Sequence, residues 1–126
     1  MKTIIHTSEA PAAIGPYSQA TLANGTLYIS GQIPVDPETG KLVEGIDKET
    51  HQVMKNLKAI LTAADMNFDN AVKASIFLKN MDDFAVVNEI YASYFNNDQF
   101  PARETVQVSC LPKNVDVEIS MIAYKD

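Results

Sequence analysis

Two residues of complementary chemistry lie in the last third of the chain. Arg103 follows Pro101-Ala102, and Glu118 lies within Val115-Asp116-Val117-Glu118-Ile119. Arginine stays charged, and its planar guanidinium binds a carboxylate through two parallel hydrogen bonds. A glutamate can position or deprotonate a water molecule. The pair therefore indicates a small anion-binding site that acts on a small carboxylic acid.

The spacing of Arg103 and Glu118 predicts that they bracket a ligand. We expect strands at 104–110 and 115–124 to be neighbours, with Arg103, Thr105 and Gln107 on the same open face as Glu118. A symmetric turn between them would pair Gln107 with Glu118, so that Arg103 and Glu118 stand roughly 13 Å apart along the strands. The alternative is an ordinary cross-strand salt bridge. The offset favours a ligand and a water between the two side chains, or contacts with a neighbouring subunit.

Three further residues, Tyr17, Ser30 and Gly31, are candidates for the same site, and a fourth, Glu104, could interfere with it. Tyr17 follows Gly15-Pro16, and its phenol either donates a hydrogen bond into a cleft or packs. Gly31 follows Ser30, and it either admits a ligand close to the backbone or meets a conformational need of the strand end. Alternation directs Glu104 toward the helices, from where its carboxylate reaches solvent or competes with an anionic substrate for Arg103.

The periodicity of the chain predicts strands and two helices. Asn24-Gly25 favours a tight hairpin turn, and apolar residues recur every three or four positions after Asp47, which we expect to cap a helix. In the strand that follows, Val72, Ala74, Ile76 and Leu78 should share one side. The expected strands are 3–6, 18–23, 26–30, 72–79, 104–110 and 115–124, and the expected helices are 47–65 and 83–95, the second burying Phe84, Val87, Ile90, Tyr91 and Tyr94.

These elements predict one α+β domain spanning residues 1–126. Both helices should cover one face of a six-stranded, mostly antiparallel sheet. The side chains on the other face would be too apolar to lie fully exposed to water and too polar to form a dry core. We therefore expect copies of the same chain to cover it, with polar clefts where subunits meet. The open-face residues would be Ser75, Phe77, Arg103, Thr105, Gln107, Glu118, Ser120 and Ile122.

Composition excludes several classes of function. A formal net charge of −6 without a cluster of Lys or Arg argues against nucleic-acid binding. Cys110 has no partner for an internal disulfide and is expected in the core, while His6 and His51 lack metal-ligand spacing. No apolar run resembles a signal peptide or a membrane span, and no glycine-rich phosphate loop is present. We expect a cytoplasmic protein without a metal or cofactor.

Five motifs carry a resemblance to a known family. They are Ala-Pro-Ala-Ala-Ile-Gly-Pro-Tyr-Ser-Gln at 10–19, Ser-Gly-Gln-Ile-Pro at 30–34, Pro-Ala-Arg at 101–103, Leu-Pro-Lys at 111–113 and Val-Glu-Ile at 117–119. In order and spacing they resemble the RidA (YjgF) family of reactive intermediate deaminases over nearly the whole chain. The resemblance implies a chorismate-mutase-like α+β fold, a homotrimer with ligand clefts between subunits, and no cofactor.

The resemblance also implies roles for individual residues. Arg103 would hold the substrate carboxylate and Glu118 would orient the attacking water, with Tyr17, Ser30, Gly31 and Thr105 in the cleft. The implied reaction is hydrolysis of 2-enamine and 2-imine acids, such as 2-aminoacrylate and 2-aminocrotonate, to 2-keto acids and ammonia. Glu104 and Thr105 replace the small residue and cysteine that many members carry after the arginine. The alternatives are a noncatalytic metabolite-binding regulator and, third, a translation inhibitor or ribonuclease.

Overall fold

A tight hairpin starts the sheet where Asn24-Gly25 predicts it. In the computed structural model, which describes residues 1–126, β2 (Ala20–Ala23) pairs with β3 (Thr26–Gln32). Asn24 and Gly25 both adopt left-handed backbone, with φ of 49° and 79°, as a two-residue type I′ turn requires. A β-carbon on Gly25 would lie 2.5 Å from the carbonyl oxygen of Lys125. The predicted hairpin is confirmed, although β2 begins at Ala20 and β3 continues to Gln32.

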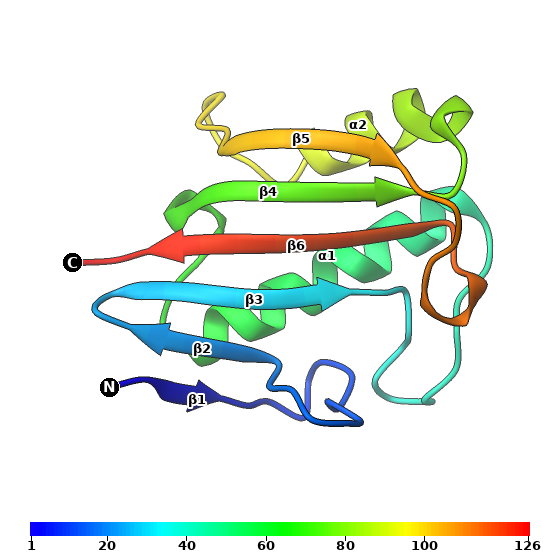
Figure 1. Ribbon diagram of the computed structural model, residues 1–126. Helices are drawn as coiled ribbons and strands as arrows, with labels where there is room; N and C mark the ends of the chain where they lie inside the picture. Colours follow the sequence, from blue (N-terminus) through cyan, green and yellow to red (C-terminus); the bar gives the residue numbers. More distant parts are fainter.

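The six strands form one sheet in the order β1-β2-β3-β6-β4-β5 (Figure 1). Each neighbouring pair is antiparallel except β4 and β5, which are parallel. The prediction of a six-stranded, mostly antiparallel sheet is thus confirmed. The remaining strands are β1 (Thr3–Ile5), β4 (Ala71–Leu78), β5 (Ala102–Gln107) and β6 (Val117–Tyr124).

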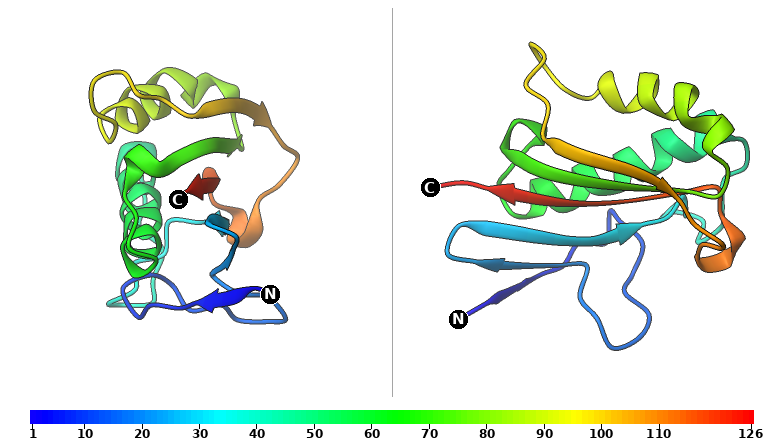
Figure 2. Two further views of the ribbon diagram at one scale, coloured as in Figure 1. Left: turned by 90° about the vertical axis from the view of Figure 1, so that its left-hand side faces the viewer. Right: turned by 45° about the horizontal axis from the view of Figure 1, so that its top comes forward.

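Both helices, α1 (Ile46–Ala63) and α2 (Phe84–Ala92), cover the same face of the sheet, as expected (Figure 2). Two details of the helices differ from the prediction. Gly45, not Asp47, occupies the N-cap of α1, and no side chain caps that end. The second helix ends at Ala92, and Phe84 is 38% exposed at its first turn. The α1 side chains buried against the sheet include Val53, Met54, Leu57, Ile60 and Leu61.

Alternation along β6 separates the two faces of the sheet as predicted. Its odd-numbered residues are buried against the helices, whereas Glu118, Ser120 and Ile122 lie on the open face. Strand β4 departs from strict alternation at its start, because an irregularity in register between Ala71 and Lys73 leaves Val72 49% exposed. The prediction for Val72 was therefore wrong. The rest of β4 buries Ala74, Ile76 and Leu78 as expected.

The predicted pairing of the last two strands was wrong. Strand β6 lies between β3 and β4, whereas β5 is an edge strand that pairs only with β4. The connection between β5 and β6 is a long loop with left-handed backbone at Lys113 and Asn114, not a tight hairpin turn. Cys110 is exposed in this loop rather than buried. Strand β6 buries four apolar side chains on one face. Burial of this apolar area stabilises a central position in the sheet more than pairing with β5, its neighbour in sequence, would.

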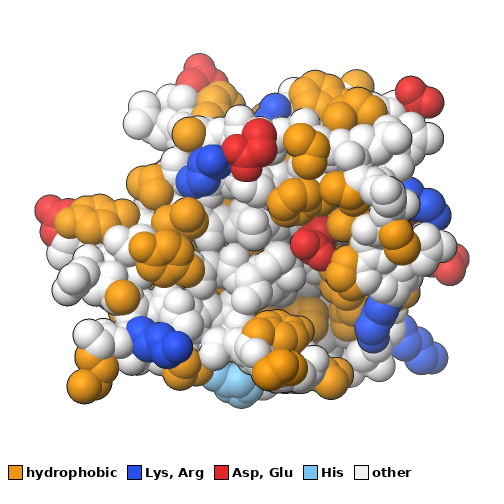
Figure 3. Space-filling view, viewed as in Figure 1, with side chains coloured by type: hydrophobic (Ala, Val, Ile, Leu, Met, Phe, Trp, Pro, Cys, Tyr) orange, Lys and Arg blue, Asp and Glu red, His pale blue; other side chains and the backbone are white.

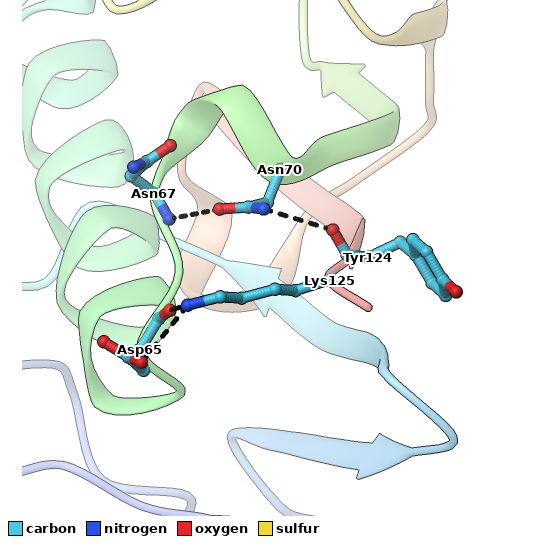
Figure 4. Close-up of polar contacts among 5 residues, drawn as sticks. All are labelled: Asp65, Asn67, Asn70, Tyr124 and Lys125. Carbon is cyan, nitrogen blue, oxygen red and sulfur yellow. Dashed lines mark hydrogen bonds and ion pairs between the residues drawn. The ribbon is translucent and has the colours of Figure 1, made fainter.

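Polar contacts fix the C-terminal end of β6 to the connection between α1 and β4 (Figure 4). Lys125 Nζ donates to the carbonyl oxygen of Asp65 at 2.7 Å and pairs with its Oδ2 at 3.2 Å. Asn70 Nδ2 donates to Tyr124 O at 3.2 Å, and Asn70 Oδ1 accepts from the Asn67 amide. Glu118 lies at the other end of β6.

No helix of this structure combines the length and the apolarity that crossing a membrane requires.

A buried carboxyl on α1 should make stability depend on pH. Glu49 is 4% exposed, and its Oε1 accepts from the Asp116 amide at 3.1 Å. Burial, followed by a hydrogen bond to the Asp116 carboxyl, raises the pKa of Glu49 from 4.5 to about 7. The folded state thus retains a proton that the unfolded state releases, so the free energy of unfolding should fall as pH rises from 4.5 to 7.

Glu49→Gln should remove most of that fall, because glutamine keeps both hydrogen bonds without ionising. Thermal denaturation of both proteins at pH 5 and pH 8 measures the difference. Asp83 and Glu118, whose pKa values burial also raises, leave a smaller slope of the same sign. Equal losses of stability in the wild type and the variant would contradict the assignment to Glu49.

Candidate functional site

An open cavity of about 910 Å³ lies beside the C-terminal end of β3. Its walls are the segment 6–14, the end of β3 with the loop after it, and the turn at Pro112-Lys113. Tyr17, Ser30, Gly31 and Glu118 all line it. We call this cavity the Glu118 pocket. The structure therefore brings together four of the six residues that the sequence predicted for the site.

Gly31 is required by the close approach of Glu118. A β-carbon on Gly31 would lie 2.5 Å from Glu118 Oε2 and 2.8 Å from its Cδ. Gly31 is not among the residues with positive φ, so conformational freedom does not explain the glycine. The carboxylate itself occupies the space that a side chain at position 31 would fill. Neither sequence interpretation of Gly31 anticipated this contact.

Glu118 has no ion pair within the chain, whose two salt bridges involve other residues. Burial alone raises the pKa of its carboxyl above the ordinary value. A carboxylate that is half buried and unpaired is a better proton acceptor than a solvated one. Glu118 therefore has the electrostatics of a general base that faces a cavity.

Ser30 and Tyr17 differ in how firmly they are held. The Ser30 hydroxyl donates to Ser18 O at 2.7 Å, and its amide donates to Gln19 O at 2.9 Å. The side chain of Tyr17 is 55% exposed, and its amide donates to Gly15 O across a turn in which Gly15 has φ of 126°. Ser30 thus ties the Tyr17 segment to β3, and the Tyr17 phenol lies at the pocket without a hydrogen bond to the chain.

Arg103 lies elsewhere in the fold and on the other face of the sheet. It is paired with buried Ala74 of β4 and points toward α2, where Nη1 donates to Asn88 Oδ1 at 2.8 Å. Its guanidinium carbon lies 5.1 Å from the centre of the Tyr91 ring and 5.7 Å from that of Phe84. We call Arg103, Asn88, Tyr91 and Phe84 the Arg103 cluster. The prediction that Arg103 shares the open face with Glu118 was wrong.

No carboxylate neutralises the only arginine of the chain. Its contacts are an amide oxygen and two aromatic faces, which hold a guanidinium without cancelling its charge. Burial raises the pKa of Tyr91 to about 12 despite the opposing effect of Arg103, so its phenol stays neutral. The Arg103 cluster therefore presents an oriented, uncompensated positive charge.

One chain does not bring Arg103 and Glu118 together. Strand β4 separates them, with Ala74 opposite Arg103 and Phe77 opposite Glu118. Their backbones are thus offset by about 10 Å along the strands and about 10 Å across them, and their side chains point to opposite faces. The two halves of the predicted site can meet only if a second chain is present.

Glu104 and Thr105 also lie on the faces opposite to those predicted for them. Glu104 lies on the open face, where it pairs with Lys73 Nζ at 2.9 Å and accepts a hydrogen bond from Ser75 Oγ. The Ser75 contact and then Lys73 hold the pKa of Glu104 below its usual value. Thr105 lies on the helix side, and its buried hydroxyl has no partner. Glu104 therefore does not compete for Arg103 within the chain.

The reversal along β5 follows from its position at the edge of the sheet. Burial of Val106 and Val108 suggested which side faced the helices, but an edge strand lies largely outside the core and Val106 is 40% exposed. Register with β4 decides the orientation instead, since Ala74 and Ile76 are buried opposite Arg103 and Thr105. Gln107 also lies on the helix side, and its Oε1 accepts a hydrogen bond from the Met81 amide at 2.8 Å.

Asn88 is the functional candidate that sequence reasoning missed. It stands four residues after Phe84 and three before Tyr91, on the same side of α2. A polar residue within a stripe predicted to be buried was the available signal. Only the packing of β5 next to α2 brings Asn88 to Arg103.

Comparisons with known proteins agree with this architecture. The family model described as Endoribonuclease L-PSP matches residues 7–125. The chain is 48% identical to the human 2-iminobutanoate/2-iminopropanoate deaminase over 99% of this chain and 91% of that protein. Among solved structures it is similar to a Rid family protein of Yersinia pestis, with a TM-score of 0.97 and 53% identity over 99% and 100% of the two chains.

A third relative has a small molecule in its structure. Escherichia coli TdcF with bound serine superimposes with a TM-score of 0.93 and 39% identity over 98% of this chain and 99% of that one. The α+β sheet with two helices on one face is thus the architecture of the Rid proteins. The chain belongs to the Endoribonuclease L-PSP family, also called the RidA (YjgF) family.

Proposed function

We propose that this protein is a hydrolytic deaminase of 2-enamine and 2-imine acids, such as 2-aminoacrylate and 2-aminocrotonate. The products are 2-keto acids and ammonia. The observation that carries the proposal is the uncompensated Arg103 guanidinium, oriented by Asn88 and two aromatic rings, which suits a small carboxylate. The name of the human relative supports the same reaction.

The complete site in this proposal is shared between subunits of a homotrimer. Support comes from the separation of the Arg103 cluster and the Glu118 pocket on opposite faces of one sheet. The open face also exposes apolar side chains among few charges (Figure 3). Register places Tyr28 and Val106 on that face, where they are 50% and 40% exposed, and β5 is an edge strand. The Arg103 cluster of one subunit would face the Glu118 pocket of the next.

The proposed chemistry uses each half of the site for a separate task. Arg103 binds the substrate carboxylate through two hydrogen bonds and thereby orients the imine. A water attacks the imine carbon: the new C–O bond forms while the C=N pair moves to nitrogen, and Glu118 accepts the water proton. Glu118 then returns that proton to nitrogen, which gives a neutral carbinolamine. A second proton passes from the carbinolamine hydroxyl through Glu118 to nitrogen, the C–N bond breaks, and the oxygen lone pair closes the carbonyl as ammonia leaves.

The remaining candidate residues have supporting tasks in this scheme. Tyr17 donates a hydrogen bond from its exposed phenol, and Ser30 holds that segment against β3. Gly31 leaves the space that the Glu118 carboxylate occupies. The buried hydroxyl of Thr105 lies beside the Arg103 cluster without a partner, so in the assembled site it can bind a group from the neighbouring subunit or the substrate.

A coupled assay tests the proposed function. A dehydratase generates 2-aminoacrylate in situ, and keto-acid release is followed with and without this protein. The wild type should accelerate release, and Arg103→Ala should lose about 10- to 100-fold of that effect, since an uncompensated charge-assisted hydrogen bond contributes about 1.5–3 kcal/mol. No acceleration by the wild type would overturn the proposal; retained binding of 2-ketobutyrate would then favour a noncatalytic metabolite-binding role.

Mixing two inactive variants tests whether the site is shared. Arg103→Ala and Glu118→Gln are each expected to be nearly inactive. When they are unfolded and refolded together, about one quarter of the interfaces in a random mixture regain both wild-type residues, and activity should return in proportion. No recovery, or a single species of monomer mass in sedimentation equilibrium, would contradict a site between subunits.

A further inference from the structure

Gln19 lies buried just before β2, and its side-chain amide uses every hydrogen-bonding group it has. The residue is 2% exposed. Its Oε1 accepts from the Thr7 amide at 2.8 Å, while Nε2 donates to Thr7 O at 3.0 Å and Pro11 O at 2.9 Å, with Ala10 O at 3.3 Å. One side chain therefore binds three residues of the segment 7–11.

The segment held by Gln19 has no other hydrogen bond to the rest of the chain. Residues 6–14 contain no strand or helix, and the remaining contact among them joins the Glu9 amide to the Thr7 hydroxyl. Ala10 is the one residue there that packs in the core. Because an irregular segment normally needs several backbone partners to stay in place, its position depends on Gln19.

Gln19 also connects this segment to the end of β3 at the Glu118 pocket. Its carbonyl oxygen accepts from the Ser30 amide at 2.9 Å, next to Gly31, against which Glu118 packs. Thr7, Ala10 and Pro11 line the same pocket. Gln19 thus connects the wall formed by residues 7–11 to the strand end that carries the proposed chemistry.

We infer that Gln19 is a positioning residue of the pocket: its amide fixes the wall formed by residues 7–11 against Ser30 and Gly31. Ala10 and Pro11 of this wall, followed by Ala12 and Ile14, line the pocket and suit the aliphatic part of a substrate rather than its reacting atoms. Loss of the amide should therefore weaken substrate binding more than it slows the chemical step. This kinetic consequence rests on the proposed function, whereas the fixing of the wall does not.

Two substitutions test the inference. Gln19→Ala removes every contact, and Gln19→Glu keeps the size and the acceptor for the Thr7 amide but cannot donate to the three carbonyls when ionised. We expect KM to rise about tenfold for Gln19→Ala, equal to about 1.4 kcal/mol of binding, with kcat within about threefold. Gln19→Glu should behave similarly, which keeps the test valid if the alanine variant folds poorly.

Hydrogen exchange provides a readout that does not need activity. The Thr7 and Glu9 amides, which donate the segment's two amide hydrogen bonds, should exchange at least about tenfold faster in both variants, while the amides of α1 and β6 remain protected. Asn70→Ala is the matched control, since it also removes a carboxamide that binds backbone groups, at a site outside the pocket. It should leave KM and the exchange of residues 6–14 unchanged.

The outcomes separate this inference from the proposed function. Unchanged exchange of residues 6–14 in both variants overturns the inference, and so does faster exchange throughout the chain, which indicates only a structural role. If the wild type lacks deaminase activity but exchange rises only at 6–14, the proposed function fails while the positioning role stands. If the wild type is active and KM of both variants is unchanged, the inference fails alone.

Discussion

Asn88→Asp should lower kcat/KM for imine hydrolysis by about 100-fold, the upper end of the loss expected for Arg103→Ala. The substitution places a carboxylate where Asn88 Oδ1 now accepts from Arg103 Nη1 at 2.8 Å. A half-buried Arg–Asp pair of this geometry satisfies the guanidinium and cancels its charge, so that a substrate carboxylate must compete with a tethered one. The same pair should leave the melting temperature equal to or above that of the wild type. Enzyme kinetics, 2-ketobutyrate titration calorimetry and thermal denaturation measure these effects.

Asn88→Ala is the control for this prediction. It removes the orienting contact but leaves the positive charge of Arg103 and its two aromatic contacts. We expect a loss of about tenfold in kcat/KM, since one hydrogen bond to a charged group contributes about 1.5–3 kcal/mol, part of which water restores. Wild-type kinetics for Asn88→Asp would show that Arg103 does not bind the substrate carboxylate.

Glu118→Gln should lower kcat by about 100-fold, within the range expected for removing a general base, with a smaller change in KM. Because burial raises the pKa of Glu118, the wild-type rate should fall on the acid side at a pH above the ordinary glutamate value of 4.5. The base must be ionised to accept a proton, so activity is lost as pH falls through that pKa. The acid limb of the kcat profile should disappear in Glu118→Gln. An unchanged limb would assign the titration to another group.

Gly31→Ala should reproduce much of this loss without removing the carboxylate. Its β-carbon would meet Glu118 Oε2 at 2.5 Å, and the flexible end of Glu118 would give way. We expect a fall in kcat of at least about tenfold, because a displacement of about 1 Å at a reacting group has effects of this size. The melting temperature should change little. In the double variant with Glu118→Gln, the second substitution should add almost nothing, whereas independent effects would contradict the contact.

Local patterns predicted the elements that depend on local physics. The Asn24-Gly25 hairpin formed because both residues adopt left-handed backbone at low cost. The apolar stripe of α1 and the alternation of β6 formed because each buries one face against the other. Together with the pattern of the second helix, these features predicted an α+β layer with both helices on one side. Cys110 and Val72 were misplaced because a loop and a register irregularity, not periodicity, determined their exposure.

The candidate site was predictable in its residue types but not in its arrangement. Tyr17, Ser30, Gly31 and Glu118 do line one pocket, as their motifs indicated. Arg103 and Thr105 lie across the sheet from it, and Asn88, which orients Arg103, belongs to a helix that had been interpreted only as core. Register between strands distant in sequence is set by their common packing, which no single strand encodes.

The sequence by itself therefore determined the turn, the helices, the two faces of β6 and the residues with catalytic chemistry, because each depends on neighbours within a few positions. Only the tertiary structure decided that β6 lies between β3 and β4, and that β5 joins the edge in parallel with Arg103 facing α2. Parallel pairing needs a long crossover, and an edge strand is free of the burial that fixes orientation elsewhere. The same arrangement places Arg103 and Glu118 on opposite faces, where a single chain does not bring them together.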